Sequence, residues 1–121
     1  MMTTNQETGA KGEEAAKNYL KDLHYTILET NWRSNHLEVD IIAQNDEFII
    51  FCEVKTRSSN IMGAPESFVT PQKQQNLIRA AHRYVVTKNI DKEVRFDIIS
   101  ILSKGANCEI HHIPDAFAPK W

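Results

Sequence analysis

Three short segments with the composition of β-strands follow one another between residues 25 and 56. They are rich in β-branched and aromatic residues, and they are too short or too continuously apolar to be amphipathic helices. Asn45 and Asp46 separate the last two segments and have the composition of a tight turn. The sequence therefore predicts a three-stranded meander made of residues 25–33, 37–43 and 47–56.

Two stretches with helical periodicity flank this meander. Between Gly12 and Leu23, apolar residues recur at three- and four-residue spacing, as a helix with one buried stripe requires. The second helix begins at Thr70, whose hydroxyl can cap it, has Pro71 in its first turn, and ends near Asn89. Its expected buried stripe consists of Leu77, Ile78, Ala81, Tyr84 and Val85.

Residues 94–102 and 108–113 are expected to form two further strands. The second helix lets the first of them return parallel to the meander, which predicts an α/β fold around a mixed sheet. A chain of 121 residues with 41% hydrophobic content fits one domain. We expect a flexible leader at residues 1–8, a single domain at 9–113, an irregular loop at 58–65 and a C-terminal tail at 114–121.

The composition limits the location and the partners of the chain. No apolar run approaches the roughly 20 residues of a membrane span, and the first residues lack an apolar signal core, which predicts a cytoplasmic protein without a membrane partner. Cys52 and Cys108 lack the spacing of a zinc site and are expected to be buried, reduced thiols. His111 and His112 should point to opposite faces of a strand, both at the surface.

Glu38, Asp40, Glu53 and Lys55 form the most informative group of charged residues. A turn near Asp46 places Asp40 about opposite Glu53, and the same register makes Glu38 face Lys55. The face that they share also carries apolar residues, so ionised carboxylates there are costly unless a cation compensates them. Asp40, Glu53 and a backbone carbonyl suit Mg²⁺ or Mn²⁺, with Lys55 beside them to orient a water or stabilise negative charge, which indicates phosphodiester hydrolysis.

A simpler interpretation of these residues stays open at this point. They would then be a solvated hairpin with two cross-strand ion pairs, Glu38 with Lys55 and Glu53 with Arg33 or Arg57. The formal net charge of −2 also gives the chain no strong attraction for nucleic acid.

A set of short motifs in a fixed order resembles the YraN-like family of small bacterial proteins, which are predicted endonucleases. The motifs are Gly12-Glu13, Asn31-Trp32-Arg33, Glu38-Val39-Asp40-Ile41-Ile42, Phe51-Cys52-Glu53-Val54-Lys55-Thr56-Arg57, Gly63, Pro65, Lys73 and Arg95-Phe96-Asp97. The spacing Asp-x₁₂-Glu-x-Lys is also similar to the PD-(D/E)XK motif of restriction enzymes and archaeal Holliday-junction resolvases. One departure is Leu37, where the family usually has glycine.

The resemblance implies a restriction-endonuclease-like αβββαβ core and a role for each matching residue. Asp40 and Glu53 would bind the metal, Lys55 would be catalytic, and Glu13 would add a supporting acid from the first helix. Without the resemblance, an acid at the positive end of a helix is the better explanation of Glu13; with it, the two explanations are equally good.

Basic residues gather in the second helix and just after the third predicted strand. The helix carries Lys73, Arg79 and Arg83 but no acid, and Arg57 follows Lys55. All four are candidate contacts to nucleic acid. Arg79 and Arg83 either solvate the surface or contact phosphates, and Lys73, at the edge of the apolar stripe, could face the cleft. Arg57 and the loop that follows it either close over a substrate or form only a long connector.

The leading hypothesis is a Mg²⁺- or Mn²⁺-dependent endonuclease that acts on DNA, including branched or damaged DNA. The alternatives are a non-catalytic nucleic-acid-binding adaptor with the same fold and a protein-interaction domain. The sequence leaves open whether the chain forms a homodimer or works with a protein partner.

Overall fold

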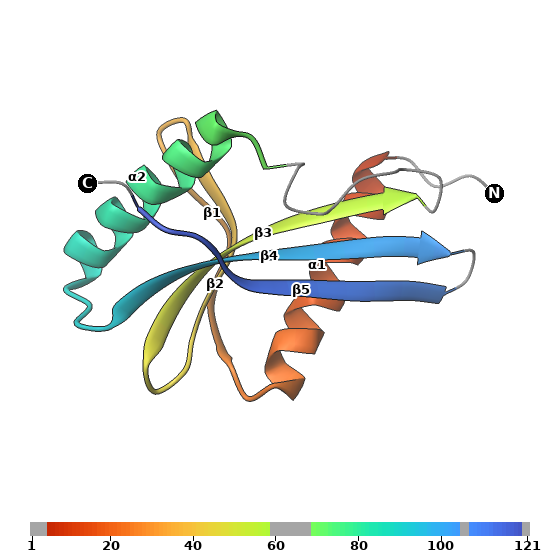
Figure 1. Cartoon of the computed structure of the whole chain (residues 1–121), viewed down its shortest axis with the longest axis horizontal. Coiled ribbons are helices and arrows are strands. Elements are labelled where there is room, and N and C mark those ends of the chain that lie inside the picture. Colours follow the sequence, from red (N-terminus) through yellow and green to blue (C-terminus); the bar gives the residue numbers. More distant parts are fainter. Residues whose placement is uncertain (1–4, 59–68, 105–106, 120–121) are drawn as a thin grey trace.

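The structure is a computed structural model that describes residues 5–58, 69–104 and 107–119, and the expected order of elements is confirmed (Figure 1). The helices are α1 (Asn5–Asp22) and α2 (Pro71–Lys88). The strands are β1 (Thr26–Ser34), β2 (Leu37–Gln44), β3 (Phe48–Ser58), β4 (Glu93–Lys104) and β5 (Asn107–Phe117). The loop expected at residues 58–65 falls almost wholly outside the described residues.

The strands form one mixed sheet in the order β1-β2-β3-β4-β5. The pairs β1–β2, β2–β3 and β4–β5 are antiparallel, whereas β3 and β4 are parallel and are connected through α2. Helices α1 and α2 lie on opposite faces of the sheet (Figure 1). The predicted α/β fold class is therefore confirmed.

Each helix buries its apolar stripe against one face of the sheet. On the α2 side, Leu77 and Ala81 pack in one cluster with Ile42, Phe51 and the residues around them. On the α1 side, the buried residues are Ala16, Leu20, Ile41, Ala43, Ile50, Cys52, Ile99 and Ile101. Each fully buried large apolar side chain contributes about 1.5–3 kcal/mol. Ile42 and Phe51 are therefore covered by α2.

Local signals at the ends of α2 act as predicted. The Thr70 hydroxyl accepts a hydrogen bond from the Lys73 backbone N–H at 3.2 Å, and Pro71 opens the helix. Asn89 ends it in the left-handed conformation, with φ of 54°. The turn between β2 and β3 is likewise closed by the Asn45 side chain, which accepts from the backbone N–H of Phe48 at 2.7 Å.

Two predicted boundaries were wrong. Helix α1 begins at Asn5 rather than Gly12, so residues 5–8 belong to the helix and not to a leader. Strand β5 runs on to Phe117, into the expected tail. It continues because Asp115 adopts a φ of 52° in an irregular stretch of pairing, after which Phe117 stacks on Phe96 with ring centroids 5.0 Å apart.

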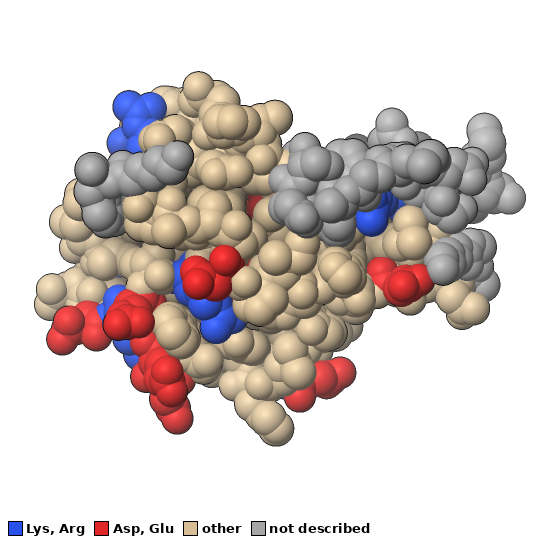
Figure 2. Space-filling view, viewed as in Figure 1, with Lys and Arg blue, Asp and Glu red and all other residues tan. Residues whose placement is uncertain are grey.

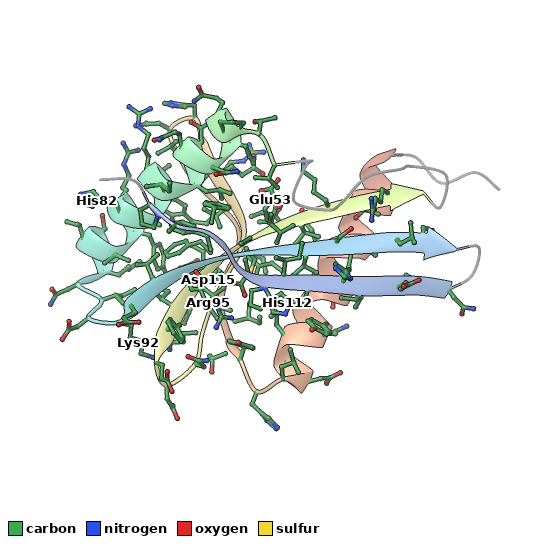
Figure 3. All side chains as sticks on the ribbon, viewed as in Figure 1. Glu53, His82, Lys92, Arg95, His112 and Asp115 are labelled. Atoms are coloured by element: carbon green, nitrogen blue, oxygen red, sulfur yellow. The ribbon has the colours of Figure 1, made fainter. Side chains whose placement is uncertain are left out.

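A buried ionic network holds this bent part of β5 (Figure 3). The Asp97 carboxylate is fully buried and accepts two hydrogen bonds from Arg95, at 2.9 and 2.8 Å, and one from the Asp115 backbone N–H at 3.0 Å. His112 Nε2 lies 2.7 Å from the same carboxylate, and His112 Nδ1 lies 3.2 Å from the Tyr19 hydroxyl. His112 is thus mostly buried, which corrects its expected surface position.

The two cysteines differ in exposure. Cys52 is buried as expected, and burial raises the pKa of its thiol well above the usual value. Cys108 is exposed at the start of β5, so the prediction that it is buried was wrong.

Charge is distributed unevenly over the molecule. Acidic side chains gather at the lower left of Figure 2, over the β2–β3 turn and the start of β4. The exposed acids of these segments are Asp46, Glu47, Asp91 and Glu93. No helix in the described part of the chain is long and apolar enough to cross a membrane.

Replacing Asp97 by asparagine should destabilise the fold by about 3–5 kcal/mol, because Arg95 would keep a mostly buried charge without a counter-ion. Urea unfolding at neutral pH measures this loss. Hydrogen bonds from His112 and Arg95 outweigh burial and lower the pKa of Asp97, so its stabilising contribution is lost only in acid, as pH falls through that lowered value.

The matched control is Asp115→Asn, because Asp115 is exposed and contributes only its backbone N–H to Asp97. Asparagine tolerates a positive φ, so this variant should stay within about 0.5 kcal/mol of the wild type. Equal losses in the two variants would contradict the role given to the Asp97 carboxylate.

Candidate metal centre at the opening between β2 and β3

The pairing of β2 with β3 sets the position of the candidate site. Ile42 pairs with Phe51 and Ile41 with Cys52, so the next opposed positions in this register are Asp40 and Glu53, as predicted. Here the regular ladder ends. Asp40 Oδ2 accepts a hydrogen bond from the Val54 backbone N–H at 2.8 Å, which replaces a backbone bond between the two strands. The strands therefore open at the level of these two carboxylates.

The Asp40 and Glu53 carboxyl groups interact closely at this opening. Glu53 is 4% exposed, and burial and the Asp40 charge raise its pKa to about 7. Burial is also the main cause of the raised pKa of Asp40, although the Val54 N–H opposes it. Glu53 Oε2 is buried and has no hydrogen-bond partner within the described residues. A buried carboxylate oxygen that accepts no hydrogen bond is suited to binding a cation.

Two lysines flank Glu53 on the α2 side of the sheet. Lys55 Nζ lies 3.6 Å from Glu53 Oε1, and Lys73 Nζ lies 3.6 Å from Glu53 Oε2. Lys55 is two residues further along β3, whereas Lys73 comes from the first turn of α2, which faces Glu53 (Figure 3). Lys73 therefore lies at the opening, and its ammonium group opposes the rise in the pKa of Glu53.

Glu13 reaches the same opening from the α1 side. Gly12 lies directly against the Thr56 side chain of β3, where a Cβ atom would collide, so α1 can approach the sheet closely at this point. Burial raises the pKa of Glu13, a hydrogen bond with Asn31 opposes this rise, and the charges of Asp40 and Glu38 add to it. Glu13 therefore belongs to the same electrostatic cluster as Asp40.

Glu38 does not take the expected position beside Lys55. It pairs with Arg33 of β1 at 3.6 Å, and no Glu38–Lys55 pair occurs among the ion pairs of the described residues. The reason is a break in the alternation of β2, since Val39 and Ile42, three positions apart, both pack in the α2-side cluster. Glu38 thus adds negative charge near Asp40 and Glu13 from its position beside Arg33, not from one beside Lys55.

The other predicted basic residues lie further from the carboxylates. Arg57 lines a small pocket of about 110 Å³ with Ser100, Leu102, Glu109 and His111. Arg79 and Arg83 lie in an open groove along α2, and one Arg83 nitrogen donates to the Ser34 hydroxyl at 2.9 Å. The structure thus brings Glu13, Glu38, Asp40, Glu53, Lys55 and Lys73 together, and it leaves Arg57, Arg79 and Arg83 around them.

The ligand set for a cation would be small. The described residues contain no group of three or more His, Cys, Asp or Glu side chains arranged to hold a metal. Asp40 and Glu53 supply two carboxylates, and Mg²⁺ is commonly bound through one or two carboxylates while it keeps several waters. Glu53 Oε2, which has no hydrogen bond within the described residues, and this donor chemistry therefore fit such a cation.

Sequence reasoning missed two contributors to the site. Asn31, with a φ of 52°, hydrogen-bonds Glu13, and Ser34 binds Arg83 across 49 positions of sequence. The only local signal for the first is asparagine, which adopts a positive φ more readily than most residues. No spacing in the chain indicates the second.

Comparison with known proteins gives the family. A model of the uncharacterised protein family UPF0102 matches residues 12–101, which include every candidate site residue. The chain belongs to this family.

Several UPF0102 proteins match along nearly their whole length. The proteins of Christiangramia forsetii and Bacteroides fragilis are 47% and 42% identical, over 96% and 98% of this chain and 98% of each relative. That of Syntrophomonas wolfei is 43% identical over 93% of this chain and 99% of its own. The expected family is thereby confirmed, and these names state no activity.

The raised pKa of Glu53 predicts how stability changes with pH. Between pH 4.5 and about 7 the folded protein keeps a proton that the unfolded chain has lost, so the free energy of unfolding falls as pH rises through this window. Glu53→Gln cannot ionise and should reduce that fall, by up to about 3 kcal/mol. Urea unfolding of both proteins at several pH values in this window, with metals chelated, measures it. Parallel stability curves would contradict the prediction.

Proposed function

We propose that this UPF0102 protein is a metal-dependent endonuclease that hydrolyses DNA phosphodiester bonds at Asp40, Glu53 and Lys55. The observation that carries the proposal is the close pair of Asp40 and Glu53 carboxyl groups at the strand opening, where one buried Glu53 oxygen has no hydrogen bond from any residue that the structure describes. Keeping two such groups together is costly for a fold, which is typical of a site selected for its chemistry.

Each residue has a distinct part in this proposal. A Mg²⁺ or Mn²⁺ ion held by Asp40 and Glu53 would polarise a phosphoryl oxygen and lower the pKa of an attacking water. Lys55 stabilises the negative charge that develops on the phosphoryl group. Glu13 and Glu38 surround Asp40 with negative charge, which favours the arrival of a cation.

The distribution of charge supports a nucleic-acid substrate despite the net charge of −2. The exposed acids Asp46, Glu47, Asp91 and Glu93 lie at the β2–β3 turn and around the start of β4, whereas Lys55 and Lys73 lie beside Glu53 at the opening. Lys73, Arg57 and Arg79 are the proposed contacts to phosphates. Branched or damaged DNA is the proposed substrate class because of the similarity to archaeal Holliday-junction resolvases.

One observation favours a second candidate function. Lys55 and Lys73 each lie 3.6 Å from a Glu53 oxygen, so these two ammonium groups could bind a phosphate without cutting it. The chain would then be a nucleic-acid-binding adaptor. Salt-sensitive DNA binding with no cleavage across a panel of metals would support the adaptor.

The metal site is tested by calorimetric titration of Mn²⁺ into the wild type, Asp40→Asn and Glu53→Gln. We expect one site in the wild type and at least a tenfold weaker affinity in either variant, because each removes one of two carboxylate ligands. Asp46→Asn changes an exposed acid of the β2–β3 turn and should bind like the wild type. Mn²⁺ binding that survives in both site variants would exclude these ligands.

The role of Lys55 is tested with two variants. Lys55→Met keeps the length of the side chain and removes its charge, and Lys55→Arg keeps the charge. We expect Lys55→Met to bind Mn²⁺ and to lose at least a hundredfold in the rate of cutting, because the lysine acts on the phosphoryl group and is not a ligand. Lys55→Arg should recover part of that rate. The assay is single-turnover cleavage of labelled junction and duplex DNA, and equal loss of Mn²⁺ binding and cutting would contradict this role.

A further inference from the structure

The tip of the β1–β2 hairpin, residues 33–36, is an exposed element beside the candidate site. Ser34 pairs with Leu37, so only Asn35 and His36 form the turn, and Asn35 has a φ of 56°. Asn35 and His36 are exposed, and the Arg33 side chain is 72% exposed. The tip presents polar and basic groups to solvent.

This exposed tip is nevertheless held firmly on α2. An Arg83 nitrogen donates to the Ser34 hydroxyl at 2.9 Å and approaches the Ser34 carbonyl oxygen at 3.4 Å. Just below the tip, the Trp32 ring meets the Tyr84 ring edge to face at 5.5 Å, and Tyr84 is 4% exposed. Arg83 and Tyr84 are successive residues of α2, so their contacts fix the position of the hairpin on this helix.

Arg33 lies close to the carboxylates along the hairpin. It pairs with Glu38, and Glu38 is two residues from Asp40 on the same strand, which corresponds to roughly 7 Å. The Arg33–Glu38 pair is a 3.6 Å contact between exposed groups, and such pairs are exchanged for a phosphate at little cost.

We propose that the hairpin tip is a second contact for the nucleic acid, in which Arg33 binds a backbone phosphate near the bond that is cut at Asp40 and Glu53. A guanidinium suits this task because it can bind a phosphate through two parallel hydrogen bonds. Arg83 is a positioning residue that holds the tip in place on α2 through Ser34. The inference rests on the proposed function and deepens it, because it states where the substrate lies.

The test compares DNA binding by the wild type, Arg33→Ala and Arg33→Lys. Fluorescence anisotropy with a labelled four-way junction and a labelled duplex is followed across salt concentrations, with metals chelated. We expect Arg33→Ala to bind several-fold more weakly and to lower the slope of log affinity against log salt by about 0.9, the value for one phosphate contact. Arg33→Lys should keep the wild-type slope, since its charge is unchanged.

The matched control is Lys88→Ala, which removes one basic charge about 22 Å along α2 from Lys73. It should leave both affinity and slope unchanged. Mn²⁺ titration of Arg33→Ala should match the wild type, because Arg33 touches neither ligand.

A double-mutant cycle tests whether Arg83 acts through the tip. If it does, Arg33→Ala combined with Arg83→Ala should weaken binding little more than Arg33→Ala alone. Additive losses would instead show that Arg83 meets phosphate directly and would overturn its positioning role.

The outcomes separate this inference from the proposed function. A wild-type protein that binds Mn²⁺ and DNA, with an unchanged salt slope in Arg33→Ala, overturns the hairpin contact and leaves the metal site intact. Weakened Mn²⁺ binding in Arg33→Ala also overturns it, because Arg33 would then act on the carboxylates. A wild-type protein that binds Mn²⁺ but no DNA overturns both the hairpin contact and the nuclease.

Discussion

The hydrogen bond from the Val54 backbone N–H to Asp40 Oδ2 is the interaction on which the candidate site depends. It ends the regular pairing of β2 and β3 without leaving the Val54 donor unsatisfied, so the strands can separate in the middle of a packed sheet. The separation exposes the Asp40 and Glu53 carboxyl groups to each other and to residues from both sides. Glu13 enters from α1, and Lys73 enters from α2.

Much of the fold could be predicted because its signals are local. Thr70, Pro71 and Asn89 define the ends of α2 through their own backbone preferences, and the strand composition of β1 to β3 is read from short windows. It could also be predicted that Asp40 lies opposite Glu53, since a tight turn at Asn45 fixes the register of β2 against β3.

The errors at Glu38 and His112 have physical causes that a regular sequence pattern does not contain. Glu38 turns away from Lys55 because β2 breaks its alternation between Val39 and Ile42, which a strict period of two cannot anticipate. His112 is buried because Asp97 and Tyr19 enclose it, and Tyr19 is 93 positions away in the sequence. Such contacts form only once the layers have packed.

The bent end of β5 also determines how this edge of the sheet meets other molecules. An edge strand with free N–H and C=O groups is a template for another strand, and it can lead to aggregation. Here Pro114 has no N–H to offer, and the N–H of the next residue, Asp115, is already donated to Asp97. The same buried network that fixes the fold therefore protects this stretch of the edge from pairing with a neighbouring chain.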